Sequence, residues 1–224
     1  MSSVVSHEIL HQLGIIGIHA DLIRNADGEG APEESLAQAR QNAQAIEAAL
    51  GDVNRVLKDL LVFSRDLRLN LYEHSLKAVL EEALADCRAY ASERGVELRL
   101  ECPEGMSLPL DKLKLKQALL NILRNAVEAS PRGKAVVVRA DAEEGFATVR
   151  VSDRGPGVPP SDREQIFTPF FTTKDHGTGL GLAIAREFVR AHGGRLFVDS
   201  PAGEGGATFV LQLPLTSSVA ASLT

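Results

Sequence analysis

The stretch 6–14, SHEILHQLG, contains two histidines four residues apart, with a glutamate directly after the first. On a helix, His7 and His11 lie one turn apart on the same face, which is the spacing of a zinc-protease motif with Glu8 as its base. The same residues suit phosphate acceptance, because a neutral imidazole is a nucleophile and a neighbouring carboxylate can hold its second ring N–H. The two chemistries require different residues elsewhere in the chain.

A zinc site needs a third protein ligand, and none stands at the expected position. In the extended protease pattern a histidine follows Gly14 by three residues, but here Gly17 occupies that place and His19 comes two residues later. A glutamate from a following helix would have to come from heptad-patterned sequence, which is typical of helix packing. We therefore interpret His7 as a phosphate acceptor and Glu8 as its base, an interpretation that requires a phosphoryl donor site.

A first candidate for this donor site lies in the apolar stretch 111–129, which has helical periodicity. Asn121, Asn125 and Glu128 share one polar stripe, opposite an apolar face. Amide oxygens one turn apart suit Mg²⁺, a hard ion that binds oxygen ligands and substrate phosphates, although solvated amides produce the same pattern.

Two glycine-rich segments follow. Asp153 ends a strand-like run and precedes Gly155 and Gly157, so the backbone can approach a flat ligand while the carboxylate accepts a hydrogen bond from an amine; an ordinary turn has a similar composition. Residues 177–181, GTGLG, open a helix, where glycines leave backbone N–H groups free to meet phosphates at the positive helix end. Between them, three phenylalanines in 166–174 predict a lid that packs aromatic side chains on the domain.

Hydrophobic periodicity divides the chain in two. Heptad-spaced apolar residues up to Leu67, interrupted by a turn-rich stretch at 25–32, predict two helices joined by a loop. A hairpin cannot bury such a seam alone, so we expect two copies to form a homodimeric four-helix bundle. From about residue 70, alternating helix and strand patterns predict an α/β sandwich with helices on one face of a mixed sheet.

The expected fold class is therefore α+β, with a helical hairpin at 1–69, an α/β sandwich at 70–215 and a frayed polar tail at 216–224. A net charge of −6 and an aromatic content of 4% argue against nucleic-acid binding. No apolar run approaches the roughly 18 residues of a membrane span. Cys87 and Cys102 lack metal or redox spacing, which favours reduced thiols and a cytoplasmic location.

In this order, the motifs resemble those of the sensor histidine kinases, whose catalytic domain shares its ATP-binding fold with gyrase. The resemblance covers residues 6 to about 214 and rests on six segments: the H box at 6–8, the N box at 119–129, glycine boxes at 153–158, 177–185 and 203–214, and the F box at 166–171. The sequence PFFTTK-x-x-GTGLGL at 169–182 is most similar to that of the nitrogen-regulation type of histidine kinase.

The resemblance implies an ATP-dependent protein-histidine kinase that phosphorylates His7 and passes the phosphoryl group to an aspartate of a response regulator. It implies ATP and Mg²⁺ as cofactors, with Asn125 as the metal ligand and Asp153 as the adenine reader. Further ATP-binding residues that it implies are Asn121, Gly155, Gly157, Lys174, Gly177, Thr178, Gly179, Leu180, Gly181 and Thr208. His11 and Gln12 stand where the family usually has Asn or Thr and often Pro, so phosphatase activity is not implied.

Two alternatives remain open: a phosphotransfer or scaffold protein with an inactive nucleotide domain, and a nucleotide-binding regulator that inhibits a partner without using His7. The first helix also carries a second apolar strip, Ile15, Ile18 and Leu22, on the side of His7. The heptad seam of this helix is a different set of residues, Ile9, Leu13, Ile16, Ala20 and Ile23. The strip either packs within the bundle or stays exposed for a helix of the receiver domain.

Overall fold

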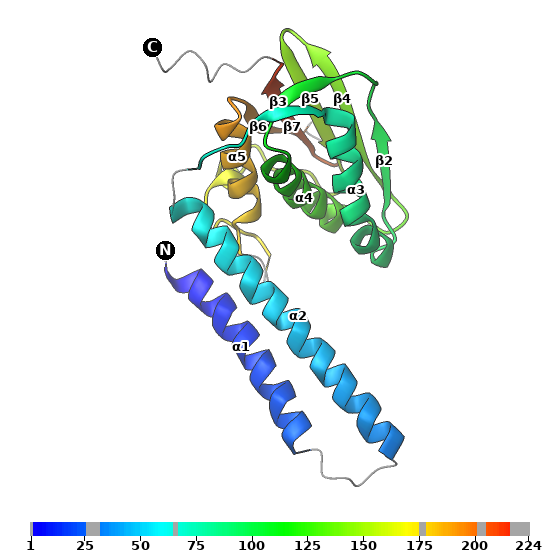
Figure 1. Ribbon diagram of the computed structural model, residues 1–224, viewed down its shortest axis with the longest axis vertical. Helices are drawn as coiled ribbons and strands as arrows, with labels where there is room; N and C mark the ends of the chain where they lie inside the picture. The colour runs from blue at the N-terminus through cyan, green and yellow to red at the C-terminus, as the bar shows by residue number, and fades with distance from the viewer. Residues whose placement is uncertain (1, 26–31, 65–66, 175–177, 201–204, 216–224) are drawn as a thin grey trace. The chain divides into compact units, whose positions relative to one another are not determined.

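The structure, a computed structural model, describes residues 2–25, 32–64, 67–174, 178–200 and 205–215. Gly177, the tail at 216–224 and the side chains of His7 and Glu8 lie outside the described residues. The chain divides into two compact units: one is built on the helical hairpin and includes residues 172–178, and the other is built on β-sheets (Figure 1).

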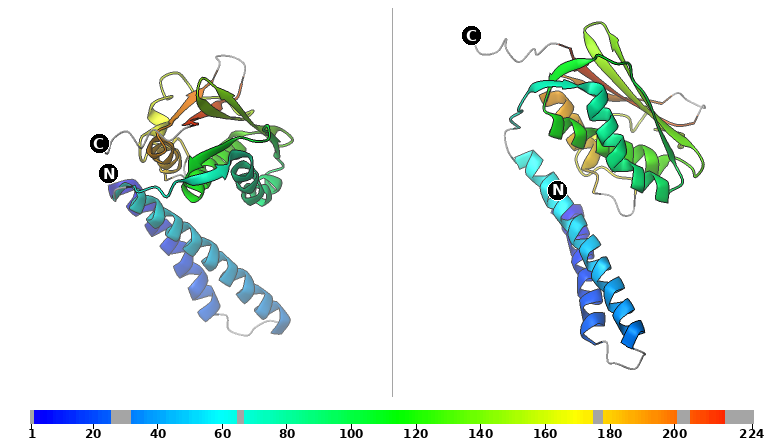
Figure 2. Two further views of the ribbon diagram at one scale, coloured as in Figure 1. Left: turned by 45° about the horizontal axis from the view of Figure 1, so that its top comes forward. Right: turned by 45° about the vertical axis from the view of Figure 1, so that its right-hand side comes forward.

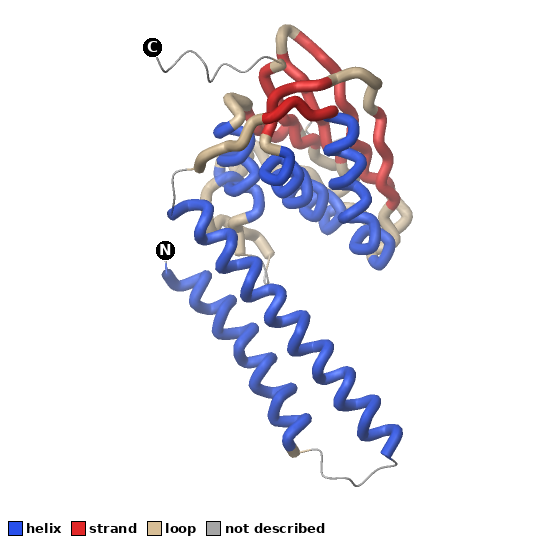
Figure 3. The backbone as a smooth tube through the Cα atoms, viewed as in Figure 1, coloured by secondary structure: helices blue, strands red, loops and turns tan. Residues whose placement is uncertain are grey.

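The hairpin consists of α1 (Ser2–Arg24) and α2 (Pro32–Ser64), which run side by side (Figure 3). The heptad pattern predicted both helices, but Leu67, which continues the pattern, lies beyond the end of α2. A polar contact joins the two helices, because His19 Nδ1 on α1 and Asn42 Oδ1 on α2 are 3.1 Å apart.

The heptad seam is not the surface that closes the hairpin. On α2, Asn42 and Ala49 are buried, and each stands one position before a seam residue that is exposed, Ala43 and Leu50. On α1, the seam residue Leu13 is 50% exposed. Because successive residues on a helix are about 100° apart, the buried line and the heptad line lie side by side. A single chain therefore leaves much of the seam uncovered.

The second unit contains a five-stranded mixed sheet in the order β2-β4-β5-β7-β6. The strands are β2 (Glu97–Glu101), β4 (Ala135–Glu143), β5 (Phe146–Ser152), β6 (Arg195–Asp199) and β7 (Thr208–Pro214). Only the β2–β4 pair is parallel among these ladders. One face is covered by α3 (Leu76–Glu93), α4 (Lys112–Ala129) and α5 (Gly181–Ala191), as Figure 2 shows. The α/β sandwich expected from the sequence is confirmed.

A second, two-stranded sheet was not expected from the sequence; in it β1 (Tyr72–Ser75) pairs antiparallel with β3 (Ser107–Leu110). Four-residue strands are too short to show a period of two, and the polar sequence YEHS has little β-propensity. The short helix η1 (Gln165–Phe167) was likewise not expected.

Alternation along the strands places their apolar residues against the helices. On β4 the buried residues are Val136, Val138 and Ala140, and on β5 the inward set is Ala147, Val149 and Val151. The predicted apolar face of α4 (Leu119, Ile122, Leu123 and Ala126) is buried, which confirms that prediction. This packing fixes the rotation of α4 about its axis and so the direction of its polar stripe.

Candidate functional site

The polar stripe of α4 meets the start of α5. The Nδ2 group of Asn121 donates a hydrogen bond of 2.9 Å to the carbonyl oxygen of Gly181, the first residue of α5. This bond orients the amide and leaves its Oδ1 atom as the remaining acceptor. Asn125, one turn further along α4, is half-buried. The Asn121 amide therefore lies next to the glycine segment, with a second amide one turn along the same stripe, and amide oxygens at this spacing suit Mg²⁺ with phosphates.

The third residue of the stripe has a different role. The carboxylate of Glu128 accepts a hydrogen bond from the Tyr90 hydroxyl on α3. Burial and this bond raise the pKa of Tyr90 to about 12, and the Arg94 guanidinium lies 3.8 Å from the ring centroid. Glu128 is thus engaged in α3–α4 packing.

Asp153 follows the last residue of β5 and is only 5% exposed. Its Oδ1 atom accepts hydrogen bonds from the backbone N–H groups of Gly155, at 2.8 Å, and Ala207, at 3.0 Å. Within the described part of the chain, no donor contacts its Oδ2 atom. Burial raises the pKa of Asp153, although the two backbone N–H groups act in the opposite direction. A buried carboxylate held by one oxygen can offer the other to an exocyclic amine.

The glycines after Asp153 are required by close packing. A Cβ atom on Gly155 would lie 2.6 Å from the carbonyl oxygen of Ala129, the last residue of α4. Gly157 has a φ of +81°, and a Cβ atom there would lie 2.7 Å from Ser200 Oγ. The loop therefore fits closely between the end of α4 and the end of β6.

Two buried serines, which sequence reasoning missed, hold this loop. Ser200 Oγ accepts a hydrogen bond from the Val158 N–H and donates one to the carbonyl oxygen of Gly206. Ser130 Oγ accepts from the Arg154 N–H at 3.3 Å. Each serine precedes a proline, so the sequence looks like an ordinary turn, and only the fold brings the hydroxyls to the loop.

The two glycines described in the second glycine segment differ in their surroundings. Gly179 has a φ of +64°, and a Cβ atom there would lie 2.5 Å from the carbonyl carbon of Phe170, whose N–H donates to the Gly179 carbonyl at 3.0 Å. At Gly181 the nearest atom to an added Cβ would be Asn121 Cγ at 3.7 Å, an ordinary contact.

We therefore expect Gly179→Ala to lower the free energy of unfolding by about 1–3 kcal/mol, since a left-handed backbone and a backbone clash both oppose the new methyl group. Gly181→Ala, the matched control, should change it by less than about 0.5 kcal/mol. Urea unfolding of both variants measures the difference. Equal effects at the two positions would mean that the loop has a different conformation in solution.

The F box packs as the sequence predicted for its first phenylalanine. Phe167 is buried and meets Phe209 of β7 edge to face, with ring centroids 6.4 Å apart. Arg186 of α5 donates a hydrogen bond of 3.2 Å to the Phe167 carbonyl oxygen. Phe170 and Phe171 are half-buried. The F box is thus fastened to the helix that begins with the glycine segment.

Four further residues that the resemblance implies for nucleotide binding are Thr208, Leu180, Lys174 and Thr178. Thr208 Oγ1 lies 2.9 Å from Ser152 Oγ on the neighbouring strand, so it is the backbone of Ala207 and not the Thr208 side chain that reaches Asp153. The Leu180 side chain is fully buried, which leaves its backbone for any ligand. Lys174 is exposed, with its N–H bonded to a neighbouring threonine, and Thr178 is half-buried.

On the hairpin, the described side chains near the His7–Glu8 pair are largely exposed. His11 is exposed, as its place outside the seam predicted. In the second apolar strip, Ile18 is 62% and Leu22 51% exposed, while Ile15 is half-buried. Among the residues that the structure describes, no three His, Cys, Asp or Glu side chains gather in a metal-binding cluster.

Comparison with known proteins defines first the class of the sheet unit. Residues 110–217 match the family model described as histidine kinase-, DNA gyrase B- and HSP90-like ATPase. The mycobacterial sensor histidine kinase MprB is a solved structure similar to this chain at 33% identity and a TM-score of 0.60, covering 66% of this chain and 99% of that one. The sheet unit therefore has the ATP-binding fold of this ATPase class.

Longer matches extend over the hairpin. The sensor protein FixL of Bradyrhizobium diazoefficiens is 36% identical over 222 residues, which is 96% of this chain and 43% of that protein. The histidine kinase ThkA, solved in complex with the response regulator protein TrrA, is 25% identical with a TM-score of 0.72, covering 97% of this chain and 61% of that one. The chain belongs to the sensor histidine kinases, a family of protein-histidine kinases.

The chain spans less than half the length of the curated relatives it matches. The predicted family is confirmed, whereas the nitrogen-regulation subtype stays a prediction because these relatives are of several kinds. No helix within the described ranges is both long and apolar enough to cross a membrane.

Proposed function

We propose that this chain is an ATP-dependent histidine kinase core that phosphorylates its own His7 and passes the phosphoryl group to an aspartate of a response regulator. The observation that carries the proposal is the buried carboxylate of Asp153, of which one oxygen is held by the backbone N–H groups of Gly155 and Ala207. A site that had lost its ligand would gain stability by replacing this carboxylate, because burial makes its charged form costly.

In this proposal Asp153 Oδ2 accepts a hydrogen bond from the adenine amine, and Asn125, with Asn121 nearby, would hold the metal. Mg²⁺, when bound, neutralises phosphate charge and orients the terminal phosphates. The backbone N–H groups at the start of α5 face the phosphates, where the helix dipole favours negative charge. Lys174 supplies a further positive charge.

The transfer uses the two residues of the H box. One ring nitrogen of His7 forms a bond to the γ-phosphorus while the bond to the β,γ-bridging oxygen breaks and ADP leaves. Glu8 holds the second ring N–H and takes up the proton, so that a neutral phosphoimidazole results. The phosphoryl group then passes from the ring nitrogen to a carboxylate oxygen of the receiver's aspartate.

The adenine contact should depend on pH. Only ionised Asp153 accepts the amine hydrogen bond, and burial raises the pKa of this carboxyl group. As the pH is lowered, adenosine affinity should therefore begin to fall at a higher pH than it would with a carboxyl group of ordinary pKa. Below the pKa of Asp153 the loss should approach about tenfold per pH unit. Adenosine is the suitable probe, because it carries no titrating phosphate.

Calorimetric titrations of wild type and Asp153→Asn, from about pH 7.5 to about pH 4, close to the ordinary pKa of a carboxylate, measure this dependence. The variant should bind weakly and independently of pH. Protonation of Asp153 does not itself unfold the protein, because its raised folded-state pKa means that this protonation stabilises the fold at low pH and the stabilisation is lost as pH rises. Acid unfolding through other carboxyl groups would weaken binding to the variant as well, so the variant controls for it. A wild-type affinity that stays constant would exclude Asp153 as the amine acceptor.

The uncovered seam on the hairpin supports a homodimer. Leu13 and Leu50 are 50% and 47% exposed in the single chain, and heptad-spaced apolar side chains bury their surface when two hairpins form a four-helix bundle. The exposed residues Ile18 and Leu22, with Ile15, form a separate strip for the receiver domain. The response regulator bound to ThkA supports a partner of this kind.

We further place this kinase in the cytoplasm, in the nitrogen-regulation subtype suggested by residues 169–182. The test of the kinase assignment is incubation of purified protein with Mg²⁺ and either γ-labelled or α-labelled ATP. Label from the γ position alone, lost in acid and retained in alkali, supports a histidine kinase. Nucleotide binding without label would support the inhibitory regulator, and absence of both would support the inactive scaffold.

A further inference from the structure

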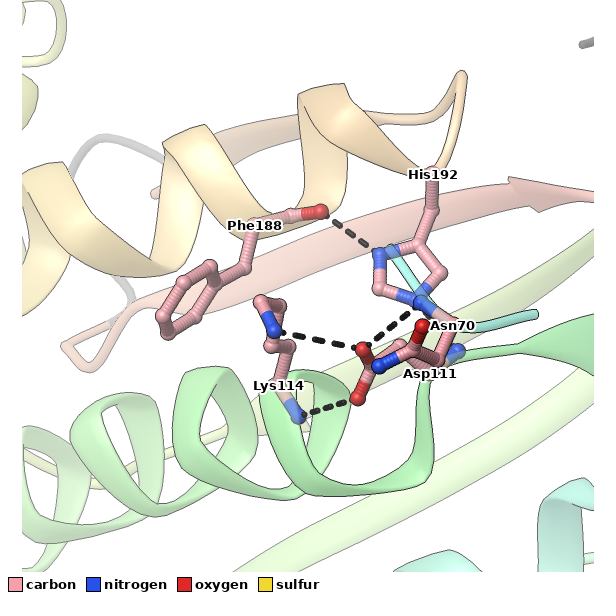
Figure 4. A network of polar contacts seen from close by, with 5 residues as sticks. All are labelled: Asn70, Asp111, Lys114, Phe188 and His192. Carbon is pink, nitrogen blue, oxygen red and sulfur yellow. Dashed lines mark hydrogen bonds and ion pairs between the residues drawn. The ribbon is translucent and has the colours of Figure 1, made fainter. Parts of the chain in front are cut away.

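His192, directly after the last residue of α5, is buried and fully hydrogen-bonded (Figure 4). Its Nδ1 atom lies 2.7 Å from the carbonyl oxygen of Phe188, and its Nε2 atom lies 3.0 Å from the backbone nitrogen of Asp111. A carbonyl can only accept and a backbone N–H can only donate, so the ring carries its hydrogen on Nδ1 and accepts at Nε2. This arrangement requires the neutral imidazole.

Asp111, on the other side of this contact, is the N-cap of α4. Its carboxylate accepts hydrogen bonds from the Lys114 N–H, the Lys114 ammonium and the N–H of Asn70, which lies in the segment between α2 and β1. Burial raises the pKa of Asp111, but these donors together hold it below its ordinary value. A charged cap thus fixes the start of α4 while its own N–H points to His192 (Figure 4).

A second contact joins the same two helices at the other end of α5, where Asn121 donates to the Gly181 carbonyl. At about 1.5 Å per residue, Asp111 and Asn121 are about 15 Å apart along α4, and Gly181 and His192 about 16 Å apart along α5. The two helices therefore run antiparallel with matched lengths between two hydrogen bonds. This frame restrains sliding of α5 along α4.

Sliding matters because the phosphate-facing groups belong to both helices. The glycine segment opens α5, whereas Asn121 and Asn125 project from α4. A displacement of α5 along its axis by even a few tenths of an ångström changes the distance between these groups. Asp153 is held differently, by backbone N–H groups of residues 155 and 207 at the ends of β5 and β7.

We propose that His192 is a positioning residue for the phosphate end of the nucleotide site, acting through its acceptor contact with the Asp111 N–H. This inference rests on the proposed function of that site. It concerns the triphosphate and its metal, and leaves the adenine contact unaffected.

The surroundings of His192 keep the acceptor available. Burial lowers the pKa of His192 and Lys114 lowers it further, whereas the Phe188 carbonyl and Asp111 act in the opposite direction. The imidazole is therefore neutral near neutral pH. An imidazolium would place a second donor against the Asp111 N–H and break the contact.

Two variants separate the two hydrogen bonds of the ring. His192→Gln can place an acceptor near the Nε2 position and restore the bond from Asp111, while His192→Asn reaches only the Nδ1 position and leaves the Asp111 N–H unpaired. We expect His192→Asn to bind Mg²⁺-ATP about tenfold more weakly, with unchanged adenosine affinity, because a buried donor without a partner destabilises the frame. The Gln variant should stay within about threefold of wild type for both ligands.

Both affinities are measured by calorimetry at a temperature where circular dichroism shows each protein folded. Parallel loss of adenosine and Mg²⁺-ATP binding in His192→Asn would show a general structural role and overturn the inference, as would a Gln variant with selectively weakened Mg²⁺-ATP binding. A His192→Gln variant with selectively weakened Mg²⁺-ATP binding overturns the inference even where the His192→Asn variant does not fold. Wild-type protein that bound adenosine but not Mg²⁺-ATP would instead overturn the proposed function itself.

Discussion

The His7→Ala variant is expected to lose all acid-labile labelling from γ-labelled ATP while its affinity for nucleotide stays within about twofold of wild type. A methyl group has no nucleophilic atom, so no phosphoryl bond can form at this position. The residues proposed to bind nucleotide all lie outside the hairpin helix that carries His7. The variant should therefore lose labelling completely and still bind nucleotide.

The matched control is His11→Ala, one turn away on the same helix, where the imidazole is exposed. This variant should label at a rate close to wild type. Acid-labile label that persisted in His7→Ala and disappeared in His11→Ala would assign the acceptor to the second histidine.

The Asn125→Ala variant should lose about 100-fold or more in turnover. Replacing a residue that merely supports a metal ligand costs up to about 100-fold in metal affinity or activity, and removing the ligand itself should cost at least as much. The loss should appear in Mg²⁺-dependent binding of ATP, whereas adenosine affinity should not change. Titrations with ATP in the presence and absence of Mg²⁺ measure the two contributions.

Glu128→Gln provides the control on the same stripe of α4. The structure places this carboxylate against the Tyr90 hydroxyl, so the variant should keep its turnover within a few-fold of wild type. If both variants lost activity to the same degree, Glu128 would belong to the metal site, and the division of the stripe between a functional and a packing role would be wrong.

The sequence predicted those features that repeat within one element. The apolar face of α4 follows from helical spacing, and the strands β4 and β5 from runs of alternating apolar residues. The positions of Asn121 and Asp153 followed as well, because each is fixed by the element it stands on: a stripe opposite a buried face, and the end of a strand.

Contacts between distant segments could not be predicted in this way. His192 and Asp111 are 81 positions apart, and neither the histidine after α5 nor the cap of α4 indicates its partner. The same holds for Ser200, whose hydroxyl bridges two loops. The heptad pattern predicted both hairpin helices, but the pattern alone does not say whether its seam faces the other helix or a second chain. In the structure the buried Ala49 stands beside that seam.

The most direct test is to locate the phosphoryl group on the wild-type chain. Purified protein is incubated with Mg²⁺ and ATP, digested at neutral or alkaline pH to preserve phosphoimidazole, and analysed by fragmentation mass spectrometry. We predict a single modified site, the imidazole of His7, and no modification when ATP is replaced by ADP. A phosphoryl group on a serine, threonine or different histidine, or an unmodified chain that still binds Mg²⁺-ATP, would contradict the assignment of this protein as a kinase of its own His7.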